Sequence, residues 1–459
     1  TLVQPPLLAG AVRHVLDLPA PDGIEDAPVR PALEAALAFL SGPDAGPVHL
    51  NVRFDKPLEP PEGYVSPPPA AMSPSTWHAS STNRTEGVAS TSDDALQGAS
   101  PGIVVVGTLP LSARAAVSSF VARLGWPVVA DVTSGLSLPT TVVRLPTLAL
   151  RSPRVRAVLR PRSVLWLGGL TTEDAVPLWL ETLRRAHGCR VTLLTMTAWH
   201  RDPFDLADDV VAVTPERLAL LAADAAAPDA ALTDLVRRVS AATQLVRGAL
   251  DDGDALSEPA IARAVLASVR PRDGLFLGNS MPVRDADRFG DLAPDVRLIV
   301  NRGAAGIDGC IATAVGACLA TRRPTTALLG DLAVLHDLSS LAALAAPEFA
   351  GVPLRVVVVN NAGGGIFSFL PVGASVDAVT MRRFFETPHA VGLARVAGAL
   401  GLKASQVRDL SALRERLAAP PDGPELLELV TDRRDNVAVH RLLDEQLEAA
   451  VGRVLEPRR

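Results

Sequence analysis

The chain has 459 residues and a mass of 48.0 kDa, which is too long for one compact core and predicts about two to four domains. Hydrophobic residues make up 48% of the sequence and charged residues 20%, proportions typical of a globular protein and not of a disordered polyelectrolyte. The formal net charge of −6 argues against nucleic acid as a partner, because nucleic-acid-binding proteins carry excess positive charge.

The cysteines and the hydropathy pattern narrow the class further. Cys189, Cys310 and Cys318 are too few and too unevenly spaced for a disulfide framework or a tetrahedral zinc site, so a reducing compartment is expected. No run approaches the roughly 18 to 20 apolar residues that a membrane span requires, and no signal-peptide pattern opens the chain. The prediction is a cytoplasmic protein without a membrane span.

The first 60 residues resemble part of a domain. Helical patterns are expected around residues 7–16 and 31–40, and a short strand is expected within 46–54. The chain begins with Thr1, and its opening already reads like a domain interior. We therefore expect residues 1–60 to be the C-terminal part of an N-terminal domain whose front is missing, since a complete domain commonly needs about 100 to 150 residues.

Two further regions follow. Residues 61–101 are rich in Pro, Ser and Thr, the composition of an exposed linker. Residues 102–255 are predicted to form a central α/β domain with a helical connector, because short β-branched runs there alternate with helical segments, as in a parallel sheet covered on both faces. The expected strands lie in GIVVVG, WPVVADV, SVLWLGGL, CRVTLLTM and DDVVAVT.

A second α/β domain is predicted for residues 256–459. Strands are expected in DGLFLGN, VRLIVNRG, TTALLGD and PLRVVVVNN. Each of these runs ends in polar residues or glycine. Because ligands of open parallel sheets bind outside the carboxyl ends of the strands, the pattern indicates a binding edge built from several loops.

The most informative spacing joins Asp331 to Asn361, thirty residues later. An amphipathic helix over residues 332–344 and the strand LRVVVVN lie between them, so the segment reads as one βαβ unit whose two ends return to the same sheet edge. A carboxylate, an amide oxygen, a backbone carbonyl from the glycine run that follows and diphosphate oxygens would suit Mg²⁺. Taken singly, a helix cap and a strand end explain these residues equally well.

Two more loops have features that favour diphosphate binding. Residues 278–280 and 302–309 each connect a strand to a helix and contain glycine, and the free N–H groups of a helix N-terminus attract phosphate. Neither GxGxxG nor GxxxxGK[ST] occurs, which disfavours a dinucleotide site or a P-loop.

The pairing of Asp331 with Asn361 resembles the diphosphate-binding motif of thiamine-diphosphate enzymes. The surrounding runs are similar to those of the MenD family, the 2-succinyl-5-enolpyruvyl-6-hydroxy-3-cyclohexene-1-carboxylate synthases of menaquinone biosynthesis: GNSMPVRDAD, NRGAAGIDG, GDLAVLHDLSSL, VVVNNAGGGIFSFLP and FFETPH. The resemblance also covers GPVHLNVRFDKPLEP and WPVVADVTSGL, and hence most of the chain. It implies an incomplete pyrimidine-binding domain, a central α/β domain and a diphosphate-binding domain.

The resemblance also implies an activity and its site. Members of the family are transferases that decarboxylate 2-oxoglutarate on thiamine diphosphate and add the succinyl carbanion equivalent to isochorismate. By resemblance, Asp331, Asn361 and the Gly363 carbonyl bind Mg²⁺ or Mn²⁺. Four residues match the cofactor site, namely Ser280, Gly303, Ile307 and Gly330. Five match the substrate site, namely Arg284, Arg302, Ile366, Phe367 and Leu370.

Some features depart from the family pattern or stay unassigned. The resemblance places the activating glutamate in the front of the N-terminal domain, so no catalytic residue is expected within this chain and activity is expected to need the missing segment. Glu173 and Asp174 stand where the family usually carries basic residues, so a substrate contact is lost or supplied from elsewhere. His336 and His389 receive no role, because packing or capping explains each equally well.

The family shares each site between two subunits, which predicts a homodimer or tetramer. Three alternatives stay open. The first is another thiamine-diphosphate enzyme, related to acetolactate synthase or a 2-oxoacid decarboxylase. The second is a non-catalytic remnant that keeps the fold. The third is a nucleotide-binding α/β protein that does not use thiamine.

Overall fold

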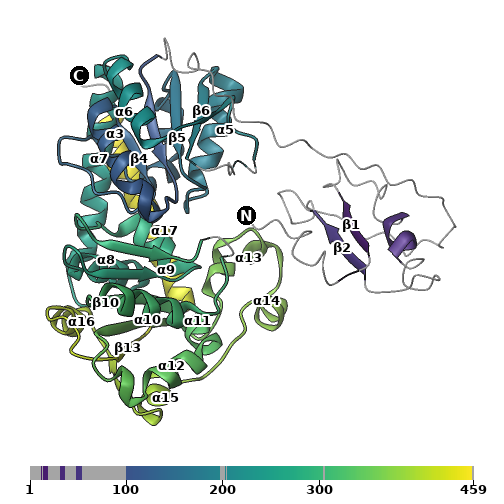
Figure 1. The fold of residues 1–459 in the computed structure, drawn as a ribbon, viewed down its shortest axis with the longest axis vertical. Coiled ribbons are helices and arrows are strands. Elements are labelled where there is room, and N and C mark those ends of the chain that lie inside the picture. Colours follow the sequence, from purple (N-terminus) through teal and green to yellow (C-terminus); the bar gives the residue numbers. More distant parts are fainter. Residues whose placement is uncertain are drawn as a thin grey trace. The chain divides into compact units, whose positions relative to one another are not determined.

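A computed structural model describes most of the chain from residue 100 onward and a few short stretches before it. The described residues are 12, 14–18, 31–36, 48–53, 100–196, 202, 204–302 and 305–456. They belong to two compact units, each of which is described by itself (Figure 1). The smaller unit holds the described residues before 54 together with 371–377, and the larger unit holds the rest.

The smaller unit contains a two-stranded parallel sheet. Strand β1 (His14–Leu18) pairs with β2 (Val48–Val52), and residues 31–36 are helical. The strand expected within 46–54 is confirmed. The helix expected around 7–16 is wrong where the structure describes it, because residues 14–16 belong to β1. Leu16 and Leu18 are buried and alternate with polar or exposed neighbours, the period of a strand. The predicted linker falls outside the described residues except for its last two positions.

The larger unit begins with a five-stranded parallel sheet, drawn in blue and teal in Figure 1. Its strands, in spatial order, are β4 (Val128–Ala130), β3 (Ile103–Val106), β5 (Ser163–Leu167), β6 (Arg190–Thr195) and β7 (Asp209–Ala212). Alternate residues of β3 enter two different hydrophobic clusters, so both faces of the sheet are covered. Helices α5 (Ala175–His187) and α7 (Ala230–Gly248) cover one face, and α3 (Arg114–Leu124) and α6 (Pro215–Asp224) cover the other.

A six-stranded parallel sheet follows, in the order β12 (Lys403–Val407), β13 (Glu425–Val430), β11 (Leu354–Asn360), β10 (Thr325–Gly330), β8 (Gly274–Leu277) and β9 (Arg297–Val300). Helices α8 (Glu258–Ser268), α9 (Met281–Phe289) and α16 (Leu410–Leu417) cover one face. The other face is covered by α10 (Cys310–Thr321), α11 (Asp331–His336), α12 (Leu338–Leu344) and α15 (Leu393–Ala399). The predicted α/β class with parallel sheets is confirmed, and β12 and β13 were not predicted.

The remaining helices are α4 (Pro153–Val158), α13 (Val372–Ser375), α14 (Ala378–Phe384) and α17 (Arg433–Leu455). Helix α17 follows β13 and packs along α7, where Leu443, Leu447 and Val451 join the hydrophobic cluster of the five-stranded sheet. The C-terminal helix thus ties the two larger sheets together, and the division at residues 255/256 stays a prediction. None of the described helices is both long and apolar enough to cross a membrane.

One helix departs from its predicted course. The single helix expected over residues 332–344 is broken at Asp337 into α11 and α12. The Asp337 carboxylate accepts the backbone N–H groups of Ile311 at 2.6 Å and Ala312 at 3.0 Å, both in the first turn of α10. Gly309, at the N-cap of α10, has no side chain to do so, and unpaired N–H groups at a buried helix end are costly. Asp337 therefore interrupts its own helix and caps another.

This cap predicts a measurable loss of stability. Asp337→Ala is expected to lower the free energy of unfolding by about 1 to 3 kcal/mol, because the N–H groups of Ile311 and Ala312 would lose their acceptor. Urea unfolding measures the change. Ser339→Ala, an exposed position on α12, serves as the control and should stay within about 0.5 kcal/mol of the unaltered protein. Equal stability of the two variants would contradict the capping role.

Candidate functional site

Asp331 lies where β10 ends and α11 begins. Its side chain is buried, and its Oδ1 accepts the N–H of Leu332 at 2.7 Å. Its Oδ2 accepts the N–H of Gly363 at 2.9 Å. Strands β10 and β11 are parallel neighbours with Gly330 opposite Val359, so the crossover returns the chain to the same edge of the sheet. The structure thereby brings Asp331 against the loop that follows Asn361.

The loop after Asn361 has a shape that requires glycine. Gly363 has φ 143°, and a Cβ there would lie 2.2 Å from the carbonyl oxygen of Glu386. The same carbonyl accepts the N–H of Gly364 at 2.6 Å. Since L side chains rarely adopt this backbone region, the glycine run is needed for the close approach of residues 363 and 364 to Glu386.

The two polar atoms of the Asn361 amide differ in their hydrogen bonding. Its Nδ2 donates to Oε1 of Glu258 at 2.8 Å, while its Oδ1 is buried and has no hydrogen-bond partner within the part of the chain that the structure describes. Buried polar atoms are nearly always paired, so an unpaired amide oxygen points to an ion or a ligand group. The free Oδ1 and the nearby Asp331 carboxylate are oxygen donors of the kind that Mg²⁺ prefers.

The remaining ligands of such an ion would not be further His, Cys, Asp or Glu side chains. Among the described residues, no group of three or more His, Cys, Asp or Glu is arranged to hold a metal. A cation at Asp331 and Asn361 would therefore complete its shell with backbone carbonyls and with oxygens of a bound molecule. That donor set fits Mg²⁺ held together with a diphosphate.

Two contacts around this pair were missed by sequence reasoning. His389 Nε2 lies 3.1 Å from Oδ2 of Asp331. Burial raises the pKa of the Asp331 carboxyl, against the N–H groups of Gly363 and Leu332 and the His389 ring, which lower it. The run FFETPH marked His389 only as part of a motif, and no signal linked it to Asp331.

Glu258 is the second missed residue. It opens α8, yet its side chain is buried instead of reaching solvent as an acid in a first helical turn usually does. Its Oε1 also accepts from the Thr431 hydroxyl at 3.2 Å. Burial, followed by the negative charge of Asp285, raises the pKa of Glu258 to about 8. Nothing in the sequence around Glu258 separates it from an ordinary capping acid.

The two candidate substrate arginines lie beyond the ends of β8 and β9, Arg284 in α9 and Arg302 two residues after β9. Arg284 Nη1 donates to the carbonyl of Ser280 at 2.9 Å, and Ser280 itself caps α9 with φ 70°. Arg302 Nη1 donates to Oδ1 of Asn279 at 3.0 Å. Burial lowers the pKa of Arg284, and the positive charges of Arg288 and Arg302 lower it further, partly opposed by Asp174. The two guanidinium groups therefore form one basic region.

The remaining candidate residues are placed as follows. Gly330 ends β10, and Ile307 is half-buried against the hydrophobic cluster that includes α10. Ile366 and Phe367 lie in the 3-10 turn that follows Asn361, and Leu370 follows it directly; all three side chains are half-buried. Gly303 lies outside the described residues.

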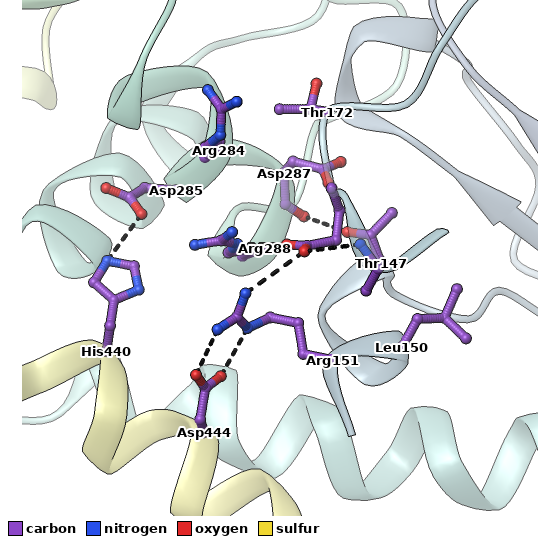
Figure 2. A network of polar contacts seen from close by, with 12 residues as sticks. Thr147, Leu150, Arg151, Thr172, Arg284, Asp285, Asp287, Arg288, His440 and Asp444 are labelled. Atoms are coloured by element: carbon purple, nitrogen blue, oxygen red, sulfur yellow. Dashed lines mark hydrogen bonds and ion pairs between the residues drawn. The ribbon is translucent and has the colours of Figure 1, made fainter. Parts of the chain in front are cut away.

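Helix α9, which carries Arg284, is held by buried polar contacts (Figure 2). Arg288 Nε donates to Glu173 Oε2 at 2.6 Å, and Arg151 Nη1 lies 3.5 Å from the other oxygen of Glu173. Arg151 also pairs with Asp444 of α17 at 2.6 Å. Figure 2 shows the Arg284 side chain directed away from these ion pairs.

The same helix is fixed at two more points. His440 of α17 lies 3.1 Å from Asp285, and Asp287 accepts the backbone N–H of Val132 at 2.6 Å. Figure 2 also shows that these acids and Arg288 come from one helix and meet partners from separate parts of the chain. Glu173, which departs from the family pattern, therefore has a buried positive partner in Arg288. Sequence reasoning did not predict this pair.

The Glu173 pairs predict a pH-dependent stability. Burial raises the pKa of Glu173, but Arg288 and Arg151 outweigh burial and leave it below the usual 4.5. A carboxyl with a lowered folded-state pKa stabilises the fold above its unfolded-state pKa, and that contribution is lost as the pH falls through the folded-state pKa. Glu173→Gln should cost about 3 to 5 kcal/mol near neutral pH, and the cost should shrink below about pH 4.5.

Urea unfolding of both proteins over a series of pH values measures this cost. Glu181→Gln, which breaks a partly exposed pair with Arg185 on α5, serves as the control and should cost about 1 kcal/mol or less. A cost for Glu173→Gln that is the same at acid and neutral pH would show that the ion pairs do not carry the effect.

The comparisons with known proteins agree on one family. No protein-family model matches the chain. The chain is 36% identical over 480 residues to a protein of Rubrobacter xylanophilus, covering 98% of this chain and 79% of the relative. It is 33% identical over 481 residues to a protein of Myxococcus xanthus and 32% identical over 489 residues to one of Haloarcula marismortui, with 79% of each relative covered. All three are named 2-succinyl-5-enolpyruvyl-6-hydroxy-3-cyclohexene-1-carboxylate synthase.

Proposed function

The chain belongs to the 2-succinyl-5-enolpyruvyl-6-hydroxy-3-cyclohexene-1-carboxylate synthase family of thiamine-diphosphate-dependent transferases, and from this premise we propose that it serves that reaction in menaquinone biosynthesis. The substrates are 2-oxoglutarate and isochorismate. Thiamine diphosphate supplies the electron sink for the decarboxylation. The observation that carries the proposal is the buried Oδ1 of Asn361 near Asp331, which has no hydrogen-bond partner among the described residues.

Asp331, Asn361 and the carbonyl of Gly363 would hold Mg²⁺ or Mn²⁺ in this proposal. Asp331 and Asp285 both add to the raised pKa of Glu258, so negative charge gathers around Asn361. A divalent cation would relieve the mutual repulsion of these buried acids. Ser280, Gly303, Ile307 and Gly330 would then contact the cofactor.

Arg284 and Arg302 would bind the carboxylates of the substrates. Each guanidinium already donates one hydrogen bond, Arg284 to the carbonyl of Ser280 and Arg302 to Oδ1 of Asn279, which orients it. Within the described part of the chain, the other N–H groups of both arginines are available to a substrate. Two half-buried cations near each other repel, and an anionic substrate would reduce that repulsion. A planar guanidinium can bind a carboxylate through two parallel hydrogen bonds.

Ile366, Phe367 and Leu370 would form the apolar wall of the isochorismate pocket. The Phe367 ring packs edge-to-face on Phe385 with ring centroids 5.5 Å apart, which fixes one side of that wall. A homodimer or tetramer would complete the site, because the family shares each site between two subunits.

The activity is tested by CO₂ release from 2-oxoglutarate with thiamine diphosphate and Mg²⁺, using the protein as its own cells make it. Release that requires isochorismate is expected. Release that isochorismate does not affect, or turnover of pyruvate in place of 2-oxoglutarate, would favour a different thiamine-diphosphate enzyme. Binding of ATP or NAD in place of thiamine diphosphate would contradict the assignment.

Asp331→Ala should abolish the metal dependence of cofactor binding. Removal of this carboxylate is expected to weaken thiamine diphosphate binding at least about tenfold in Mg²⁺ and to make binding insensitive to EDTA. Titration calorimetry with and without EDTA measures this. Glu348→Gln, an exposed acid in the same domain, is the control and should bind as the unaltered protein does. Unchanged Mg²⁺-dependent binding by Asp331→Ala would remove the metal assignment.

Arg284→Gln and Arg302→Gln should each raise the KM of a dicarboxylate substrate about tenfold or more, because a hydrogen-bonded charge pair would be lost. Thiamine diphosphate affinity should change little. Steady-state kinetics with each substrate varied in turn gives the KM values. A fall in cofactor affinity with an unchanged KM would place these arginines at the cofactor instead.

A further inference from the structure

The orientation of the Asn361 amide decides what it can bind. Only Oδ1 can donate electrons to a metal ion, whereas Nδ2 repels one. The two ends of an amide have nearly the same shape, so a ligand asparagine needs a neighbour that tells them apart. In the structure, Nδ2 has a partner and Oδ1 has none among the described residues.

That neighbour is Glu258. Its Oε1 lies 2.8 Å from Nδ2 of Asn361 and also accepts from the Thr431 hydroxyl. In the structure, Oε1 of Glu258 accepts an N–H from Nδ2 of Asn361. If the amide were turned over, Oδ1 of Asn361 would face Oε1 instead, and two acceptors would oppose each other. The preference holds for the carboxylate and for the neutral acid with its proton on Oε2, because Oε1 then accepts both hydrogen bonds.

An ordinary structural role does not explain this side chain. Helix α8 is already capped by Ser257, whose hydroxyl accepts the N–H of Ala260. Glu258 is 3% exposed, a costly place for a carboxyl that the helix does not need. Its hydrogen bonds go to Asn361 and to Thr431, which follows the end of β13.

We propose that Glu258 is a positioning residue that orients the Asn361 amide so that Oδ1 faces the divalent cation. This inference rests on the proposed function and deepens its metal site. Residues that hold a metal ligand by its second polar atom commonly change metal affinity 10- to 100-fold when they are removed. Glu258 acts through Asn361 and need not touch the metal or the cofactor.

The test measures Mn²⁺ binding by the loss of the free-ion electron paramagnetic resonance signal in the presence of thiamine diphosphate. Glu258→Leu keeps the bulk but removes the acceptor, and should raise the Kd for Mn²⁺ about 10- to 100-fold. Glu258→Gln keeps an acceptor at Oε1 and should stay within about threefold of the unaltered protein. Rescue by Gln distinguishes orientation from charge and from packing.

A matched control removes a different buried acid, which lies in the six-stranded sheet that α8 covers. Glu425 lies at the amino-terminal end of β13 and pairs with Arg355 and Arg416. Glu425→Gln should lower stability in urea but leave the Kd for Mn²⁺ unchanged. A matching rise in Kd for Glu425→Gln would mean that general loosening of the fold weakens the site, and the positioning role would be abandoned.

The outcomes separate the two proposals. If the unaltered chain takes up no Mn²⁺ with thiamine diphosphate, both the proposed function and this inference are overturned. If the unaltered chain binds and Glu258→Leu binds equally well, only the inference fails. Should Glu258→Leu not fold, Glu258→Met takes its place, because it also removes the carboxyl acceptor, and a Kd for Mn²⁺ equal to that of the unaltered protein would sink the inference.

Discussion

The parallel pairing of β10 with β11 is the constraint on which the site depends. A right-handed crossover must bring the second strand back beside the first, so the residues that follow both strands emerge at one edge. Asp331 and the loop from Asn361 to Gly365 are joined there by a hydrogen bond from the N–H of Gly363 to the Asp331 carboxylate. The chemistry of this edge follows from sheet geometry before any ligand is considered.

Charge divides that edge into two regions. Buried acids gather at the end of β10, in α9 and at the start of α8, where burial and the charges of Asp285 and Asp331 raise the pKa of Glu258. Arginines gather in α9, which follows β8, and after the end of β9, where burial and then the charges of Arg288 and Arg302 lower the pKa of Arg284. Like charges held close without full solvation favour ligands of opposite sign, so one region suits a cation and the other suits carboxylates. The substrates of the proposed reaction and the metal-bound diphosphate match this division.

Helix α9 connects the site to the rest of the larger unit. The nine residues of α9 include Arg284 and also Asp285, Asp287 and Arg288 (Figure 2). These last three contact α17 and residues that follow strands of the five-stranded sheet. The acid at 173, where the family usually has a basic residue, pairs with Arg288 and Arg151, so it compensates charge inside the protein. The acid at this position therefore acts in holding α9, and the proposed substrate contact of Arg284 does not depend on it.

The sequence by itself determined the α/β class, ten of the strands and the edge at which Asp331 and Asn361 emerge, because apolar runs and turn residues are local signals and a crossover has only one common hand. It did not predict β1, β12, β13 or the break at Asp337. Only the tertiary structure decided the partners of the site residues. Glu258 meets Asn361 across 103 positions, His389 meets Asp331 across 58, and Arg288 meets Glu173 across 115. Such contacts depend on how separately formed helices and loops pack, which no local period in the chain encodes.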